Sequence, residues 1–139
     1  LAGYQAQVRG MDSVDDGDGG INACRSLARK YHCIVAATGP TDIISDGERT
    51  CLVNNGTPLL TIITGAGCMA GALVSAAVGA NDDPYTATVA AITAMGMAGE
   101  KAAASMPVPL PGTFRVKLFD SIYSLTEKDI QEGGKIQCL

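Results

Sequence analysis

The sequence predicts half of a three-layer α/β fold, in which a mixed and mostly parallel sheet lies between helices. Three observations support this class. A helical repeat over residues 21–31 leads into a short apolar run at 33–37, a hairpin signal follows, and after residue 63 the chain is helical in pattern. Helices that alternate with fully apolar strands are typical of sheets covered on both faces. We therefore expect a single domain over residues 1–139.

Composition narrows the functional class. The chain has 139 residues, 47% hydrophobic and 17% charged, which is enough for one domain with a real core. A net charge of −4 without a basic run argues against a nucleic-acid partner. The five cysteines form no CxxC pair, and with His32 as the single histidine no zinc-ligand spacing occurs. No signal peptide is recognisable, so we expect reduced thiols in a cytoplasmic protein.

The first twenty residues predict little regular structure. Residues 1–8 are interpreted as the end of a helix, and residues 9–20 as a loop with four aspartates and four glycines. These aspartates do not follow the EF-hand pattern, so a solvated acidic loop is favoured over a metal site. A helix is then expected over 21–31, because its apolar residues recur at spacings of three and four.

The next segment predicts strands. The apolar run 33–37 is typical of a strand buried on both faces, and Thr38 follows at its carboxyl end, where α/β sheets gather ligands. On position alone, Thr38 is better interpreted as a turn residue. Asp46-Gly47 indicates a hairpin between strands at 42–45 and 49–53, and a further strand is expected at 59–63.

A glycine turn at residues 64–67 is the centre of the sequence. It joins the strand expected at 59–63 to an alanine-rich helix that begins near Cys68. The first amides of a helix lack intrahelical partners and carry partial positive charge, so this geometry suits an anion such as phosphate. Two alternatives stay open. The glycine spacing matches neither a Walker loop nor a dinucleotide fingerprint, so the turn could be structural, and free cysteines are usually inert and buried.

The uncharged stretch between Arg49 and Asp82 is long enough to span a bilayer. Glycines and threonines interrupt it, however, and aspartates rather than lysine or arginine follow it. We therefore expect no membrane segment.

Three helices are expected in the remainder of the chain. The first, over 85–104, has Glu100 and Lys101 as its only charges, so it should lie under other elements or in a subunit interface. A proline-rich loop at 106–112 precedes a second helix at 113–123. A short third helix follows Thr126 as its cap. The residues of the second helix expected to point inward are Phe114, Leu118, Phe119 and Ile122.

Several segments, in one collinear order, resemble the hydroxyethylthiazole kinase family. The resemblance implies a ribokinase-like α/β fold and transfer of phosphate from ATP, with Mg²⁺, to the hydroxyl of 4-methyl-5-(2-hydroxyethyl)thiazole in thiamine synthesis and salvage. It also implies a homotrimer with active sites between subunits. The matching segments are GMDS at 10–13, AATGPTDIISDG at 36–47, TGAGC at 64–68, AAITAMGMAGEKAA at 90–103, PGTF at 111–114 and LFDSIYSLT at 118–126.

The resemblance assigns roles to particular residues. Gly65, Ala66 and Gly67 match the family's anion hole for the transferred phosphate, and Gly65 also matches a substrate-binding position. Thr38 matches a nucleotide-binding threonine, which reverses the interpretation from position alone. Cys68 matches the position at which ribokinase-like relatives place a catalytic aspartate and thiazole kinases place a cysteine.

The chain departs from the family in two ways. Leu110 stands where the family has a glycine, which puts the loop near the nucleotide in question. The match also covers only the C-terminal half of the family's sequence, so the groups that bind ATP phosphates and organise Mg²⁺ lie outside it. We assign no metal ligand and expect the isolated fragment to be inactive. The alternatives are another ribokinase-like small-molecule kinase, which would normally carry aspartate at position 68, and a non-catalytic oligomerisation or binding module.

Overall fold

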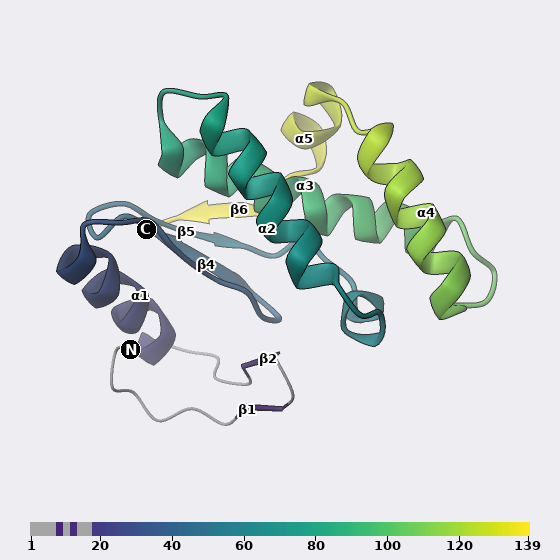
Figure 1. The fold of residues 1–139 in the computed structure, drawn as a ribbon, viewed down its shortest axis with the longest axis horizontal. Helices are drawn as coiled ribbons and strands as arrows, with labels where there is room; N and C mark the ends of the chain where they lie inside the picture. The colour runs from purple at the N-terminus through teal and green to yellow at the C-terminus, as the bar shows by residue number, and fades with distance from the viewer. Residues whose placement is uncertain (1–7, 10–11, 14–17) are drawn as a thin grey trace.

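The computed structural model describes residues 8–9, 12–13 and 18–139 of the chain (Figure 1). A two-stranded ladder at the N-terminus is separate from a four-stranded sheet, around which five α-helices are arranged. The elements are β1 (Val8–Arg9), β2 (Asp12–Ser13), α1 (Asp18–Tyr31), β3 (Val35–Ala37), β4 (Asp42–Ser45), β5 (Thr50–Val53), η1 (Pro58–Ile62), α2 (Ala66–Gly79), α3 (Pro84–Ala104), α4 (Pro111–Tyr123), α5 (Glu127–Gly133) and β6 (Ile136–Cys138).

The four-stranded sheet is antiparallel throughout, in the order β3-β4-β5-β6. The prediction of a mixed, mostly parallel sheet is therefore wrong for the described residues. The reason lies in the connections: a short turn at residues 38–41 joins β3 to β4, whereas a parallel pair needs a crossover of about a dozen residues or more. The predicted hairpin at Asp46-Gly47 is confirmed, with Ser45 paired to Thr50.

The segment predicted as a strand at 59–63 forms the 3₁₀ helix η1 instead. Pro58 cannot donate to a ladder, and the Thr57 side chain caps the turn by accepting a hydrogen bond from the Leu59 amide at 3.4 Å. The place beside β5 is taken by β6, a strand that the sequence analysis did not predict. Residues from the far C-terminus thus complete the sheet.

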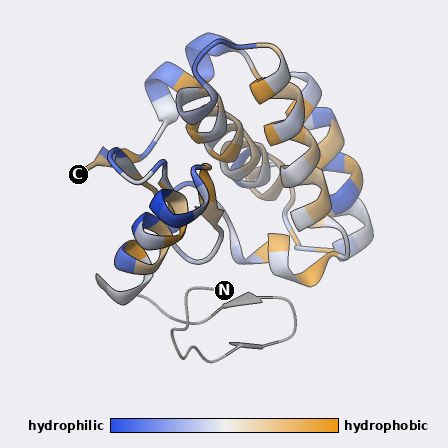
Figure 2. Ribbon diagram, turned by 60° about the vertical axis from the view of Figure 1, so that its left-hand side comes forward, coloured by the Kyte–Doolittle hydropathy of each residue, from blue (hydrophilic) through white to orange (hydrophobic). Residues whose placement is uncertain are grey.

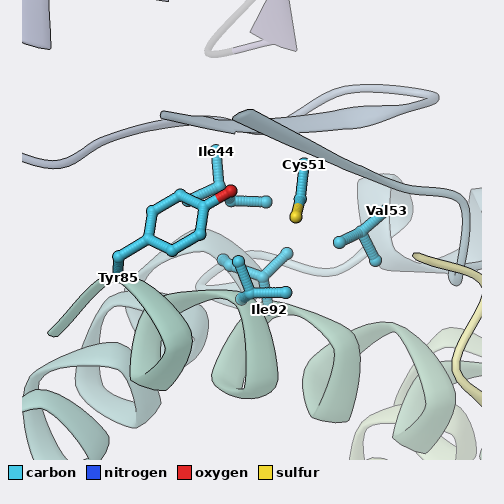
Figure 3. Packing of buried hydrophobic residues seen from close by; sticks show 6 residues of the cluster. Ile44, Cys51, Val53, Tyr85 and Ile92 are labelled. Carbon is cyan, nitrogen blue, oxygen red and sulfur yellow. The ribbon is translucent and has the colours of Figure 1, made fainter. Parts of the chain in front are cut away.

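Helices cover both faces of the sheet. Ile44, Cys51 and Val53 point from β4 and β5 toward α3, where they pack against Tyr85 and Ile92 (Figure 3). The alternate face is turned toward α1, whose Arg25 donates a hydrogen bond of 2.8 Å to the Thr50 hydroxyl. The period of two along a strand accounts for this division. Figure 1 shows α1 and α3 on opposite sides of the sheet.

The long helix α3 is the centre of the packing. Twelve of its residues are buried, which confirms the expectation that this nearly uncharged helix lies under other elements. A second hydrophobic cluster joins α3 to α2, α4 and η1, and Figure 2 shows hydrophobic residues along η1. The buried members of this second cluster are Ile63, Met95, Ala98, Ala102, Phe114 and Leu118.

A charged cluster fastens the β4–β5 hairpin to the start of α3. Arg49 donates hydrogen bonds of 2.9 and 3.0 Å to the two carboxylate oxygens of Asp83, and its guanidinium lies 4.2 Å from the centre of the Tyr85 ring. Asp83 also caps α3 through the Tyr85 amide. These contacts hold the sheet against α3 at the Ser45 end of β4, which is the end farther from Thr38.

Two of the five cysteines are bonded to each other. Cys51 and Cys138 are direct register partners across β5 and β6, and their sulfurs lie 2.10 Å apart. The prediction of reduced thiols is therefore wrong for this pair, although Cys24, Cys33 and Cys68 are free. Only the pairing of β6 with β5 brings the two residues together, over a sequence separation of 87.

Smaller predictions about the helices have different outcomes. The Thr126 cap is confirmed, and Asp129 completes a capping box. Phe119 is 52% exposed, so its predicted inward position is wrong; the buried stripe of α4 runs through Phe114, Leu118 and Ser121. Helix α1 begins at Asp18, earlier than expected.

The remaining predictions concern the N-terminal residues and the bilayer. The helix end predicted at residues 1–8 lies outside the described residues except for Val8, which is in β1. The loop expected at 9–20 includes β2 and the start of α1. Across the described part of the chain, no helix is both long and apolar enough to cross a bilayer.

Candidate functional site

The glycine turn before α2 has the backbone geometry of an open helix N-terminus. Gly65 is the N-cap residue, with φ 96° and ψ 3°, a left-handed conformation that a residue with a Cβ adopts at a cost. Its carbonyl accepts the first bond of the helix, from the Met69 amide at 2.9 Å. No side chain caps the helix, so the first amides of α2 are left for an external acceptor.

The space beside this turn is open. A Cβ atom added to Gly65 or Gly67 would meet nothing within 4 Å, and no residue of α2 is buried. Both Gly67 and Cys68 are exposed. An anion could therefore approach the amides directly, and the positive end of the α2 dipole would favour it.

Cys68 is the third residue of α2 and is a free, exposed thiol. The alternative that this cysteine is buried is therefore wrong for the described residues. Cys33 is also free and exposed, so exposure alone does not mark a site. What distinguishes Cys68 is its place in the first turn of α2, directly after the glycine turn.

Thr38 lies in the turn between β3 and β4 and is exposed. The turn is held by Asp42, whose Oδ1 accepts a hydrogen bond of 2.9 Å from the Gly39 amide. Burial raises the pKa of Asp42 to about 6, against the opposing effect of this hydrogen bond. Asp42 was not among the residues that the sequence predicted for the site; its signal is only that aspartate is a common turn residue.

The turn of Thr38 and the glycine turn lie toward the same end of the sheet. Asp42 pairs with Val53, so β5 leaves the sheet beside this turn and leads into η1 and α2. The Thr41 hydroxyl donates a hydrogen bond of 2.8 Å to Asn54, which ties the turn to that exit. Figure 1 shows the start of α2 on the same side of the molecule. Among the described residues, the two turns are connected through β5 and η1 rather than by a hydrogen bond between them.

The free amides and open space at the glycine turn fit the phosphate of a nucleotide. We assign no metal site, because within the described ranges no three His, Cys, Asp or Glu side chains gather as ligands. A surface hollow of about 590 Å³ lies at the other end of β4, lined by residues that include His32 and Glu48. It is remote from the glycine turn, so we do not assign it to this site.

The fold and the site define a class: an α/β protein with a glycine turn that leaves free amides and an exposed thiol at the start of a helix. A family model described as the hydroxyethylthiazole kinase family matches residues 1–128. The chain belongs to this family, as the motifs in the sequence predict.

Individual relatives agree with the family assignment. The chain is 54% identical over 139 residues to a hydroxyethylthiazole kinase of Desulfitobacterium hafniense, with 100% of this chain and 52% of the relative covered. It is 53% identical over 137 residues to one of Clostridium novyi, with 99% and 51% covered. The solved structure of a hydroxyethylthiazole kinase protein from Pyrococcus horikoshii OT3 matches with a TM-score of 0.82 and 38% identity, over 88% of this chain and 47% of that one. The chain spans about half the length of the curated relatives it matches.

Proposed function

We propose that the protein completed by this chain phosphorylates the hydroxyl of 4-methyl-5-(2-hydroxyethyl)thiazole with ATP. The observation that carries the proposal is the open glycine turn with Cys68 at its helix start, in a chain whose family and relatives are named for this kinase activity. The relatives' names do not favour the two alternatives, which are another ribokinase-like small-molecule kinase and a non-catalytic module.

The chain's part in the reaction is mainly electrostatic. In phosphoryl transfer the protein positions the reactants and stabilises charge on the moving group, with little covalent chemistry of its own. The amides that follow Gly65 would donate to the oxygens of the transferred phosphoryl group. Gly67 would leave room for these oxygens, because it places no side chain beside them.

Cys68 would act on the acceptor. From the first turn of α2, its sulfur could orient the thiazole alcohol and, as a thiolate, take the hydroxyl proton while the new P–O bond forms and the bond from the γ-phosphorus to ADP breaks. Gly65 would contact the same substrate, and Thr38 would contact the nucleotide from the β3–β4 turn. Mg²⁺ would neutralise phosphate charge when bound; among the described residues no three His, Cys, Asp or Glu side chains gather as ligands, and we assign none to it.

The chain would form the C-terminal portion of a larger ribokinase-like domain with three layers. Two features support this proposal. β3 is an edge strand with exposed Ala36 and Ala37, although its sequence suits a strand buried on both faces. Helix α2 buries none of its residues. The remaining half of the fold would cover both surfaces; the homotrimer and the cytoplasmic location stay predictions.

The test is formation of thiazole phosphate from ATP and Mg²⁺. The chain would be produced together with the segment of the Desulfitobacterium hafniense relative that it does not match. We expect product from the pair and none from either part alone. If the pair assembles but forms no product, the proposed activity is wrong for this chain.

A further inference from the structure

A buried asparagine joins three distant segments at the point where the chain leaves the sheet. Asn55 is 5% exposed and lies two residues after β5. Its Nδ2 donates hydrogen bonds to the Gly133 carbonyl at 3.0 Å and to Glu100 at 3.4 Å. Its Oδ1 accepts a hydrogen bond of 2.7 Å from the Lys135 amide. The side chain thus holds the exit of β5 against both α3 and the connection from α5 to β6.

Glu100 is the second member of this network. Its Oε1 accepts hydrogen bonds of 2.9 Å from the Gly56 amide and from Nζ of Lys135. Partial burial raises the pKa of Glu100, but the hydrogen bonds from Gly56, Lys135 and Asn55 outweigh it and leave the pKa below its usual value. The carboxylate is therefore ionised at neutral pH and holds a backbone amide of the loop.

The backbone of α3 is shaped to receive the same loop. A Cβ atom at Gly96 would lie 2.4 Å from the Asn55 carbonyl oxygen, and one at Gly99 would lie 3.1 Å from a methyl carbon of Leu60. Gly96, Gly99 and Glu100 share one face of the helix, since they are spaced by three and four residues. Bare backbone at two positions and a carboxylate at the third form a seat for residues 55–60.

From this seat the chain runs directly to the glycine turn. Thr57 caps η1, and Ile63 is 8% exposed in the cluster with Met95 and Phe114. Gly65 follows two residues later. The path from Asn55 to Gly65 is therefore attached to α3 at its beginning, at η1 and at Ile63.

We propose that Asn55 and Glu100 are positioning residues that set where the glycine turn presents its amides. The effect of this positioning on catalysis rests on the proposed function, in which those amides contact the transferred phosphoryl group. Displacement of a reacting group by about 1 Å can cost roughly 10² in rate, so a small shift of the loop would be measurable. The competing explanation is that the network supports only the overall stability of the fold.

The experiment compares Glu100→Ala, Glu100→Gln and Asn55→Ala with a control, Glu132→Gln. The control changes an exposed glutamate of α5 whose only ion pair, within the described part of the chain, is to Lys128 at 3.7 Å. Each variant is assembled with the complementary segment, and kcat and KM are measured together with hydrogen exchange of the peptides that cover residues 57–69 and 42–53.

We expect Glu100→Ala and Asn55→Ala to lower kcat by about 10²-fold while KM for the thiazole alcohol changes less than about threefold. Exchange should rise in 57–69 and stay unchanged in 42–53. Glu100→Gln should keep more activity than Glu100→Ala, because its amide oxygen still accepts from Gly56. If the alanine variants do not fold, Glu100→Gln replaces them in the same measurements. The control should match the wild type.

Two results of the hydrogen-exchange measurement would overturn the inference: exchange in 57–69 that stays at the wild-type level, or exchange that rises equally in both peptides. Unchanged kcat in a folded Glu100→Ala variant would do the same. If the wild-type assembly itself forms no product, the proposed function fails, while hydrogen exchange still decides whether Asn55 and Glu100 position the turn.

Discussion

The carboxylate of Asp42 accepts a hydrogen bond of 2.9 Å from the Gly39 amide and thereby closes the turn that carries Thr38. The same carboxylate is largely removed from water, which raises its pKa to about 6 from an ordinary value of 3.8. The turn that carries Thr38 is thus held by a group whose ionised form is disfavoured in the folded chain.

The substitution Asp42→Asn should stabilise the chain at neutral pH. A carboxyl whose pKa is raised by folding contributes stability that is fully present below the unfolded value and is lost as pH rises through about 6. Asparagine removes this loss and can still accept from Gly39. We expect a gain of between about 1 and 3 kcal/mol at pH 7.5 and little difference near pH 4, measured by urea unfolding. A gain of equal size at both pH values would contradict the assignment.

The bond between Cys51 and Cys138 should be detectable and stabilising. Three free thiols are expected in the oxidised protein, rising to five after reduction. Because the bridge closes a long loop over a separation of 87 residues, reduction should lower the free energy of unfolding by about 2–4 kcal/mol.

The matched control for the bridge is Cys138→Ser. This variant should have the stability of the reduced protein and should not respond further to a reductant. A count of five free thiols before reduction would show that the two cysteines are not bonded in solution.

Cys68 should tolerate aspartate better than alanine in the assembled kinase. Aspartate is ionised at neutral pH and can take a proton from the acceptor, so Cys68→Asp should keep or raise activity. Cys68→Ala should lose about 10²-fold, the lower end of general-base effects. Cys33→Ala, which removes another free and exposed thiol, is the control and should be silent. An active alanine variant with an inactive aspartate variant would make Cys68 a packing residue.

Local patterns in the sequence predicted the helices well. The starts of α3 and α5 follow from Pro84 and Thr126, whose effects act within one helical turn. The Asp46-Gly47 hairpin was also predictable, because its turn chemistry is local. The glycine turn before α2 was predictable for the same reason, because a glycine followed by an alanine-rich helix is a signal in consecutive residues; that this turn binds an anion stays a prediction.

The features that sequence did not predict depend on contacts between distant segments. Leu59 and Ile63 have the composition of a strand, but β6 occupies the edge of β5 and Pro58 starts a 3₁₀ turn. The bond of Cys51 and the network of Asn55 likewise exist only because the C-terminal segment returns to β5. No local periodicity encodes such a return, and a three-residue strand carries too little pattern to be recognised.

We propose that the glycine turn of this chain receives the transferred phosphate, and the substitution Gly67→Val tests this most directly. A Cβ atom at Gly67 would meet nothing within 4 Å apart from its chain neighbours and the backbone of its own helix, so the fold should persist, but the valine side chain would occupy the proposed phosphate position. Gly79→Val, in equally open space at the far end of α2, is the control. The measurement is thiazole phosphate formed from ATP by the chain assembled with its complementary segment. We expect product from the wild type and from Gly79→Val and none from Gly67→Val. Wild-type turnover by Gly67→Val would contradict the proposed phosphate position at the glycine turn.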